Sequence, residues 1–330
     1  LEAIAFGGML FVVLFLMRES ENFSNILPIL ALYAFAGYRL LPSLQLIYSN
    51  ATQLKFVGPA LDSMYEELKG LSPIDKYKTK DKLILNKSIK LENIYYNYPQ
   101  SSKTALKNIN LTLPAYNTIG LVGATGSGKT TVVDIILGLL EPQKGNLLID
   151  DEIINKDNFF NWQRSIGYVP QQIYLSDDTV AANIAFGIKS NEINQEAVVN
   201  ASKIANLHDF VVNELDDQYK TTLGERGIRL SGGQRQRVGI ARALYHSPKI
   251  LILDEATSAL DNLTEKAVID AVNNLSKKIT IILIAHRLST VQKCDKIYQL
   301  EKGEIKFQGN FEELSKLSNL FQENVFYTEK

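Results

Sequence analysis

The sequence of 330 residues is poor in several residue types that carry common functions. Its one cysteine, Cys294, excludes a disulfide framework and a zinc site built from several cysteines. Its 35 basic and 36 acidic side chains give a formal net charge of −1, which excludes a strongly polybasic protein. Because 45 % of the residues are hydrophobic and 22 % are charged, disorder is not the dominant state of the chain. Its chemistry must therefore come from oxygen and nitrogen ligands.

Charged side chains are scarce in the first part of the chain. Residues 1–54 contain only five, whereas the other 276 residues contain 66. The stretches 3–17 and 22–38 carry no charge. A helix of seventeen residues spans about 26 Å, slightly less than the ~30 Å hydrocarbon core of a bilayer. We therefore predict two transmembrane helices within residues 1–70, the second continuing through Arg39 into the cytoplasm.

Two other interpretations of this apolar start are weaker. A buried helical hairpin in a soluble protein has the same pattern. A secretory signal is disfavoured by Glu2 and by the lack of a basic leader and of a small-residue cleavage site. Since the chain begins at Leu1 within an apolar run, we expect it to be the C-terminal part of a longer protein.

The pattern changes twice after the apolar start. Beyond residue 54 it is amphipathic until Gly70, so residues 71–87 are expected to be a linker. From there short β-rich runs alternate with helix-like segments, which predicts an α/β domain over residues 88–325, followed by a tail at 326–330. Three runs are apolar throughout, as is typical of strands buried on both faces of a parallel sheet: residues 119–122, 250–253 and 281–284.

The first of these runs leads into a glycine-rich loop, GATGSGKT, at residues 123–130. The loop matches G-x-x-x-x-G-K-[ST], in which glycines let backbone N–H groups approach phosphate oxygens and the following helix adds the positive end of its dipole. Lys129 is predicted to reach the β- and γ-phosphates, and the Thr130 hydroxyl to bind Mg²⁺. The predicted phosphate-binding residues are Gly123, Thr125, Gly126, Ser127, Gly128, Lys129, Thr130 and Thr131.

Polar side chains follow the other two apolar runs. Asp254 and Glu255 follow the second run, and His286 follows the third. The carboxyl ends of parallel strands are where such sheets bind ligands. Asp254 is therefore predicted to hold the Mg²⁺ shell, Glu255 to orient or deprotonate water, and His286 to donate to a γ-phosphate. The alternative for the two carboxylates is a capping pair on the next helix.

A further motif distinguishes between families that contain this loop. Leu230-Ser-Gly-Gly-Gln234 precedes a helix-like stretch at 235–244, which places small residues and backbone N–H groups at a helix N-terminus as a second anion site. This segment resembles the signature of ATP-binding-cassette (ABC) ATPases, and the resemblance covers about residues 88–325. It implies a parallel RecA-like core, an antiparallel β subdomain and a helical subdomain, preceded here by the two predicted transmembrane helices. It also implies ATPase activity, with ATP and Mg²⁺ as cofactors.

The resemblance implies roles for further residues. Tyr98 matches the aromatic residue that stacks on adenine, although Tyr95 and Tyr96 are close enough to be confused with it. Gln171 resembles the glutamine that senses Mg²⁺ and the γ-phosphate, with Gln172 as the alternative. The implied catalytic residues are Glu255, His286, Gln171 and Lys129, and the implied metal site is Thr130, Gln171 and Asp254. Those implied to act on the nucleotide of the opposite subunit, or to contact that subunit, are Ser231, Gly233, Gln234 and Asp261.

The resemblance also implies how the protein works. In the family two cassettes close head to tail around ATP, so the expected partners are a second ABC subunit, in a homodimer, the lipid bilayer and an amphipathic substrate, with no nucleic acid. Residues 31–43, together with residues 1–7, are similar to bacterial flippases for lipid-linked oligosaccharides, which implies an exporter in the inner membrane with a cytoplasmic cassette. The alternatives are a peptide, drug or lipid exporter, a soluble ABC ATPase of the DNA-repair clamp type, and a nucleotide-gated membrane regulator.

Overall fold

The chain divides into two compact units, residues 1–79 and residues 80–330, and each is described by itself. The computed structural model describes residues 2–19, 23–70, 83–99, 101, 103–224, 227–228, 230–254, 278–285, 288–317 and 321.

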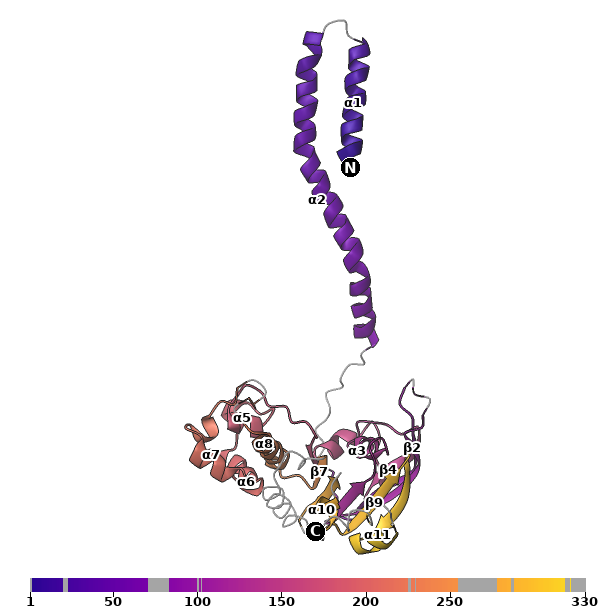
Figure 1. Ribbon diagram of the computed structural model, residues 1–330, viewed down its shortest axis with the longest axis vertical. Helices are drawn as coiled ribbons and strands as arrows, with labels where there is room; N and C mark the ends of the chain where they lie inside the picture. The colour runs from indigo at the N-terminus through magenta and orange to yellow at the C-terminus, as the bar shows by residue number, and fades with distance from the viewer. Residues whose placement is uncertain are drawn as a thin grey trace. The chain divides into compact units, whose positions relative to one another are not determined.

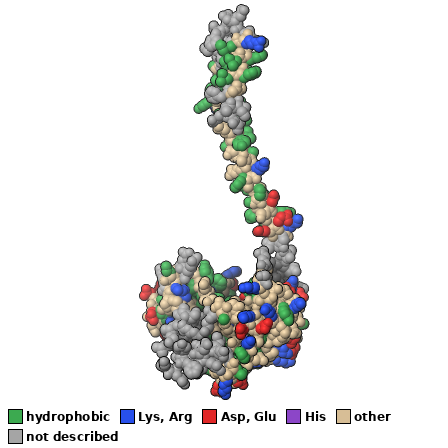
Figure 2. All heavy atoms as spheres, turned by 45° about the vertical axis from the view of Figure 1, so that its right-hand side comes forward, with side chains coloured by type: hydrophobic (Ala, Val, Ile, Leu, Met, Phe, Trp, Pro, Cys, Tyr) green, Lys and Arg blue, Asp and Glu red, His purple; other side chains and the backbone are tan. Residues whose placement is uncertain are grey.

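Residues 1–79 contain two helices, α1 (Glu2–Glu19) and α2 (Phe23–Gly70), which form a hairpin (Figure 1). Most of their described side chains are exposed, and three prolines lie inside α2. Figure 2 shows apolar side chains in green along α2, with charged side chains gathered near its C-terminal end. The two helices predicted at the start of the chain are therefore present.

The prediction that these two helices cross a membrane is not confirmed. Among the helices in the described ranges, none is both long enough and apolar enough to span a bilayer. α1 has Glu2, Arg18 and Glu19 within its eighteen residues, and Arg39 interrupts the apolar part of α2.

Residues 80–330 begin with an antiparallel sheet. Its strands lie in the order β2-β1-β4-β5, and every neighbouring pair is antiparallel. The strands are β1 (Ser88–Tyr96), β2 (Leu106–Pro114), β4 (Lys144–Ile149) and β5 (Glu152–Ile153). This sheet is the antiparallel subdomain that the family resemblance implied.

A second, mostly parallel sheet has the order β10-β9-β3-β8-β7-β6. All its neighbouring pairs are parallel except β10 with β9. The strands are β3 (Thr118–Val122), β6 (Ile166–Val169), β7 (Ile250–Asp254), β8 (Thr280–Ile284), β9 (Lys296–Glu301) and β10 (Glu304–Gly309). Since β3, β8, β7 and β6 are consecutive neighbours, their carboxyl ends share one edge of the sheet.

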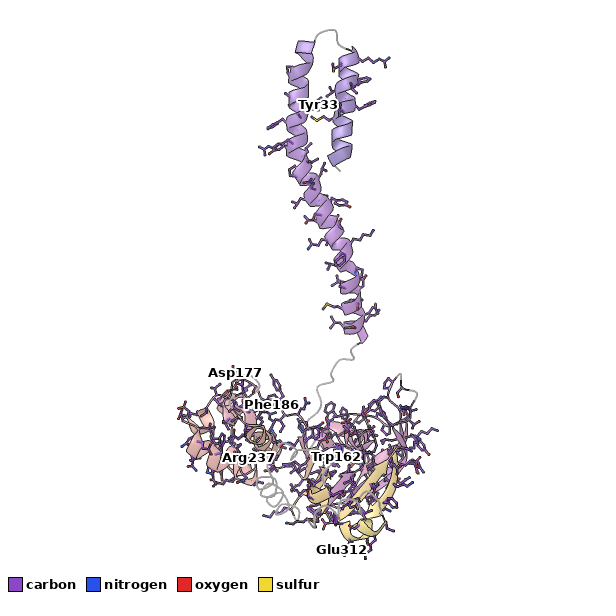
Figure 3. All side chains as sticks on the ribbon, viewed as in Figure 1. Tyr33, Trp162, Asp177, Phe186, Arg237 and Glu312 are labelled. Carbon is purple, nitrogen blue, oxygen red and sulfur yellow. The ribbon has the colours of Figure 1, made fainter. Side chains whose placement is uncertain are left out.

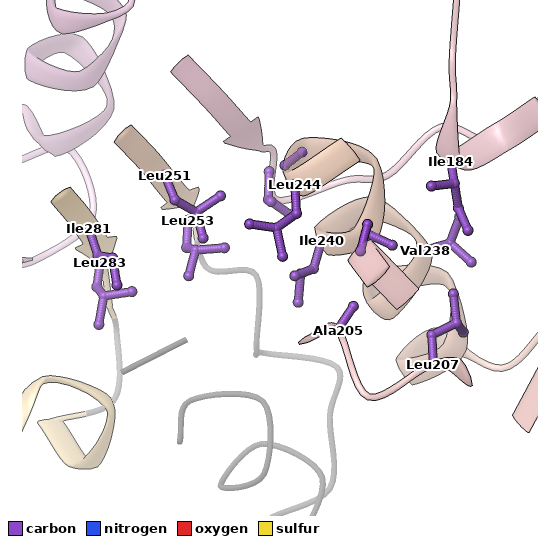
Figure 4. Packing of buried hydrophobic residues seen from close by; sticks show 14 of the residues in the cluster. Ile184, Ala205, Leu207, Val238, Ile240, Leu244, Leu251, Leu253, Ile281 and Leu283 are labelled. Carbon is purple, nitrogen blue, oxygen red and sulfur yellow. The ribbon is translucent and has the colours of Figure 1, made fainter. Parts of the chain in front are cut away.

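The three uniformly apolar runs are β3, β7 and β8, and every residue in these strands is buried. Alternate residues of β7 explain the pattern. Leu251 and Leu253 pack into a cluster with the helices that follow β6, as Figure 4 shows. Ile250 and Ile252 pack into a second cluster with α3 and the antiparallel sheet. Both faces of the strand are therefore covered, so no polar position alternates with the apolar ones.

Helices surround this parallel sheet. Trp162, labelled in Figure 3, is fully buried, and its indole N–H donates to the carbonyl of Ile136 at 2.6 Å. A separate group of helices, α5 to α8, lies to one side of the sheet (Figure 1). The helices are α3 (Lys129–Ile136), α4 (Phe159–Gln163), α5 (Val180–Ile184), α6 (Gln195–Ile204), α7 (His208–Glu214), α8 (Gly232–Tyr245), α10 (Leu288–Val291) and α11 (Phe311–Leu317), with 3₁₀ turns at Ser190–Glu192 and Gln218–Lys220.

Candidate nucleotide-binding site

The glycine-rich loop connects the end of β3 to α3, as predicted from the sequence. Two of its glycines are required by space and conformation. A Cβ atom at Gly123 would lie 2.3 Å from the carbonyl oxygen of Leu300. Gly128, the residue before α3, has φ +105°, which favours glycine, and a Cβ there would lie 2.8 Å from the Leu106 side chain. The backbone can therefore curl tightly before the helix begins.

Lys129 is buried and its ammonium group closes this curl. Its Nζ donates to the carbonyl oxygens of Gly123 at 2.8 Å and Ala124 at 3.1 Å. The neighbouring hydroxyl of Ser127 is buried and has no hydrogen-bond partner among the described residues. α3 begins at Lys129 with no side chain capping its N-terminus. Its first backbone N–H groups therefore lack intrahelical acceptors and are available to an anion.

Asp254 lies at the carboxyl end of β7, two strands from the loop. It is buried, and the Tyr168 hydroxyl donates to its Oδ2 at 3.3 Å. Burial of the hydroxyl, and to a smaller extent the charge of Asp254, raises the pKa of Tyr168 to about 12. The hydroxyl therefore stays protonated and remains a donor at neutral pH. Between the two strands, β8 ends beside β3, because the Ala285 N–H donates to the Leu121 carbonyl at 3.2 Å.

Tyr168 is a residue of this edge that sequence reasoning missed. It lies within the Gly-Tyr-Val-Pro-Gln segment that ends at Gln171, where the family resemblance implies a role only for the glutamine. Tyr168 pairs in register with Ile252, so Asp254, two residues further on, points to the same face of the sheet. That relation depends on β6 being the neighbour of β7. Gln171 follows β6 and is exposed, so it also lies at this edge.

The three tyrosines near residue 98 differ in their surroundings. The Tyr98 hydroxyl lies 3.1 Å from Oγ1 of Thr131 in α3, within hydrogen-bond distance, and the residue is 41 % exposed. Tyr96 is buried, and Tyr95 lies beneath the Lys144 ammonium, 5.8 Å from its ring centroid. Tyr98 is therefore the tyrosine whose hydroxyl reaches the helix that begins at the phosphate loop.

The signature segment lies at the start of α8, and its own side chains cap the helix. The Ser231 hydroxyl accepts from the Gln234 N–H at 3.2 Å, and the Gln234 side-chain oxygen accepts from the Ser231 N–H at 2.7 Å, which is a capping box. The other end of α8 packs on β6, where a Cβ at Gly167 would lie 2.5 Å from the Ala243 carbonyl. Ser231 is twelve residues before Ala243, so it lies about 18 Å along the helix axis from that contact. Ser231, Gly233 and Gln234 thus belong to the group of helices beside the sheet (Figure 1).

The predicted residues Glu255, Asp261 and His286 lie outside the described residues. Of the others, Thr130 is exposed in the first turn of α3, Thr131 is buried, and Thr125 and Gly126 are exposed at the tip of the loop.

The residues present fit a nucleoside triphosphate with a divalent cation. Phosphate oxygens would meet three kinds of donor: a buried ammonium group, a buried hydroxyl that has no partner among the described residues, and an uncapped helix N-terminus. The carboxylate of Asp254 and the hydroxyl of Thr130 are oxygen ligands of the kind that Mg²⁺ prefers. A glycine-rich loop between a buried parallel strand and a helix, with a carboxylate ending a nearby strand, defines a domain of the P-loop nucleotide-binding class.

Comparison with known proteins assigns this domain to a family. Residues 106–258 match the family described as ABC transporter. The chain thus contains an ABC transporter ATPase domain.

Curated proteins that include a flippase and a multidrug resistance protein are similar to the chain. It is 40 % identical to the ATP-dependent lipid A-core flippase of Aliivibrio fischeri over 247 residues, which are 74 % of this chain and 42 % of the flippase. It is 40 % identical to multidrug resistance protein 1 of Entamoeba histolytica over 271 residues, 81 % of this chain and 21 % of that protein.

A similar fold is found in the structure of a bacterial Atm1-family ABC exporter with ATP bound. The TM-score is 0.74 and the identity 30 %, over 91 % of this chain and 52 % of the exporter chain. The chain therefore spans about half of that structure, and about two fifths or less of the two curated relatives.

Proposed function

We propose that residues 80–330 bind ATP with Mg²⁺ and hydrolyse it, and that this hydrolysis drives export or flipping of an amphipathic substrate by a membrane protein of which the chain is part. The observation that carries the proposal is the arrangement of Lys129, the buried Ser127 hydroxyl and the uncapped α3 at the edge where Asp254 lies. Family membership supports it, because ABC transporter ATPase domains use ATP.

Each residue has a distinct task in this proposal. Lys129 binds the β- and γ-phosphate oxygens, which requires its ammonium to turn from the Gly123 and Ala124 carbonyls toward the ligand. Thr130, Asp254 and Gln171 hold Mg²⁺, which supplies charge neutralisation at the transferring phosphoryl group. Glu255 orients or deprotonates the attacking water. His286 donates to the γ-phosphate, and Tyr98 stacks on adenine.

We propose further that two cassettes share each nucleotide. Ser231, Gly233 and Gln234 begin α8 about 18 Å from its contact with the sheet, which favours their use on the nucleotide of a second subunit. Asp261 is proposed to contact that second subunit. With a full set of motifs in one chain, that second subunit is a second copy.

The membrane part of the proposal rests on the extent of the similarity. Residues 80–330 make up about three quarters of the chain, whereas the alignment to the Atm1-family exporter covers 91 % of it. Part of residues 1–79 therefore aligns with an exporter, which supports their proposed place in its membrane domain, with the cassette on the cytoplasmic side. The lipid A-core flippase supports a lipid-linked substrate, and multidrug resistance protein 1 favours drug export as the second candidate.

Replacing Glu255 by Gln tests the hydrolytic part of the proposal. If the carboxylate activates water, Glu255→Gln retains ATP binding but loses turnover and accumulates a closed, ATP-bound dimer. Phosphate release and size-exclusion chromatography of the wild type and the variant measure both. Glu196→Gln, at an exposed position in α6, is the matched control. Wild-type turnover in Glu255→Gln would contradict the role of this carboxylate.

A further inference from the structure

The side-chain amide of Gln143 binds the backbone of Asn97, the residue before the proposed adenine-stacking Tyr98. The last paired residues of β1 and β4 are Tyr95 and Lys144, so the strand ladder ends before Tyr98. Gln143 extends the pairing by two hydrogen bonds. The Asn97 N–H donates to the Gln143 Oε1 at 2.7 Å, and the Gln143 Nε2 donates to the Asn97 carbonyl at 2.7 Å.

These two bonds make the Gln143 side chain a substitute for a neighbouring strand. An amide side chain carries one acceptor and two donors, so it can satisfy both backbone groups of a single residue. The backbone of Gln143 is fixed as well, because its N–H donates to the Tyr95 carbonyl at 3.1 Å. Asn97 is thus held between Tyr96, the last residue of β1, and Tyr98.

The ring, the hydroxyl and the carbonyl of Tyr98 each make a contact, while part of the residue remains exposed. Its ring meets that of the buried Tyr96 edge to face, with centroids 5.1 Å apart and planes at 89°. Its hydroxyl lies 3.1 Å from Thr131 Oγ1, and its carbonyl accepts from the Ser101 N–H at 3.1 Å. With 41 % of the residue exposed, a flat ligand can lie against a ring whose orientation is already set.

We infer that Gln143 is a positioning residue for adenine recognition: it holds Asn97 and thereby sets the place of the Tyr98 ring. This inference rests on the proposed function, in which Tyr98 stacks on the base. Gln143 acts through the backbone of its neighbour, so its effect falls on recognition of the base and not on recognition of the phosphates.

Binding of two ligands by the full 330-residue chain tests this inference. ATP carries the base, and inorganic tripolyphosphate carries only the phosphates; calorimetry with Mg²⁺ present measures both affinities. Base–aromatic stacking contributes about 1–3 kcal/mol per base, so Tyr98→Ala should weaken ATP binding about 5- to 150-fold. Gln143→Ala should lose part of this stacking contribution and weaken ATP binding about three- to tenfold. Its affinity for tripolyphosphate should stay within about twofold of the wild type.

Two further variants sharpen the test. Gln143→Glu keeps an acceptor for the Asn97 N–H but replaces the donor with a carboxylate oxygen that repels the Asn97 carbonyl, so its ATP affinity should be no higher than that of Gln143→Ala. Gln195→Ala, at the exposed start of α6, is the matched control and should change neither affinity.

Three outcomes separate the inference from the function on which it rests. Wild-type ATP affinity in Gln143→Ala would overturn the inference and leave the proposed function standing. An equal loss for ATP and tripolyphosphate would also overturn it, since the residue would then act on the phosphate loop. Failure of the wild-type chain to bind either ligand would overturn the proposed function itself.

Discussion

The helices α3 and α8 both begin in glycine-containing segments, but their N-termini are built in opposite ways. α3 follows Gly128, which offers no side-chain cap, and the hydroxyl of Ser127 beside it is buried without a partner among the described residues. α8 follows Ser231, which forms a capping box with Gln234. The first backbone N–H groups of any helix lack intrahelical acceptors. In α3 these N–H groups are open to a ligand, whereas in α8 the Ser231 hydroxyl accepts a hydrogen bond from one of them.

The two ends also differ in their surroundings. Lys129, the first residue of α3, is buried, and the start of α3 shares a sheet edge with Asp254, so charges of both signs are in place for phosphate and metal. Ser231 is exposed, about 18 Å along α8 from the sheet. One end is therefore prepared to bind a nucleotide within a single chain, while the other can fold without a ligand and is suited to meet one that another chain holds.

The largest expected effect comes from removing the ammonium group at α3. Lys129→Ala should weaken ATP binding by about 100-fold or more, because each hydrogen bond from a charged group contributes about 1.5–3 kcal/mol. Calorimetric titration of ATP measures the loss. Lys203→Ala, exposed on α6, is the control and should bind like the wild type. If Lys129→Ala bound ATP normally, the contrast between the two helix ends would fail.

A different pattern is expected at α8. Ser231→Ala removes the cap and should lower the free energy of unfolding by about 1 kcal/mol, while the ATP affinity of a single chain stays within about twofold of the wild type. Thermal unfolding and titration measure these separately. Turnover should nevertheless fall, because the segment is proposed to act on the nucleotide of the other subunit.

Mixing the two variants sharpens this expectation. In a heterodimer of Ser231→Ala and Lys129→Ala chains, one site keeps both an intact loop and an intact signature, whereas the other loses both. ATP turnover should then return to about half of the wild-type value if each site works alone. Full activity at both sites would contradict sharing between subunits.

The smallest expected effect concerns Tyr168, which sequence reasoning missed. Tyr168→Phe removes one hydrogen bond to Asp254, worth about 1 kcal/mol, so the Mg²⁺ concentration that half-saturates ATP binding should change about fivefold. ATP binding without Mg²⁺ should be unchanged. Because the pKa of Tyr168 is raised to about 12, the hydroxyl donates at both pH 7 and pH 9, and the effect should be the same at both. Tyr219→Phe, which loses a bond to His208 instead, is the control.

The sequence predicted the strands and the loop because their signals are local. The three apolar runs are strands buried on both faces, and the spacing of Gly123, Gly128 and Lys129 requires a tight turn into a helix. The prediction of membrane-spanning helices is not confirmed, because it depends on counting uncharged residues across α1 and α2, where charges lie close to the apolar stretches.

What sequence reasoning could not supply depends on contacts between distant segments. Gln143 is 46 residues from Asn97, and Tyr168 is 86 residues from Asp254, so neither pair forms a motif along the chain. In the sequence, only the family resemblance favours Tyr98 over Tyr95 and Tyr96. In the structure, the contact of the Tyr98 hydroxyl with Thr131 is a further difference between the three tyrosines.

The sequence alone is enough to predict a phosphate loop at residues 123–130, since glycine conformation and a helix N-terminus act within a few residues. Which side chains hold Asp254 and the Tyr98 segment in place depends on the tertiary structure. The order of strands brings β6 beside β7 and the end of β1 beside β4, and the hydrogen bonds of Tyr168 and Gln143 form only where those neighbours meet. Hydrogen bonds act over about 3 Å, so they depend on which strands become neighbours and not on distance along the chain.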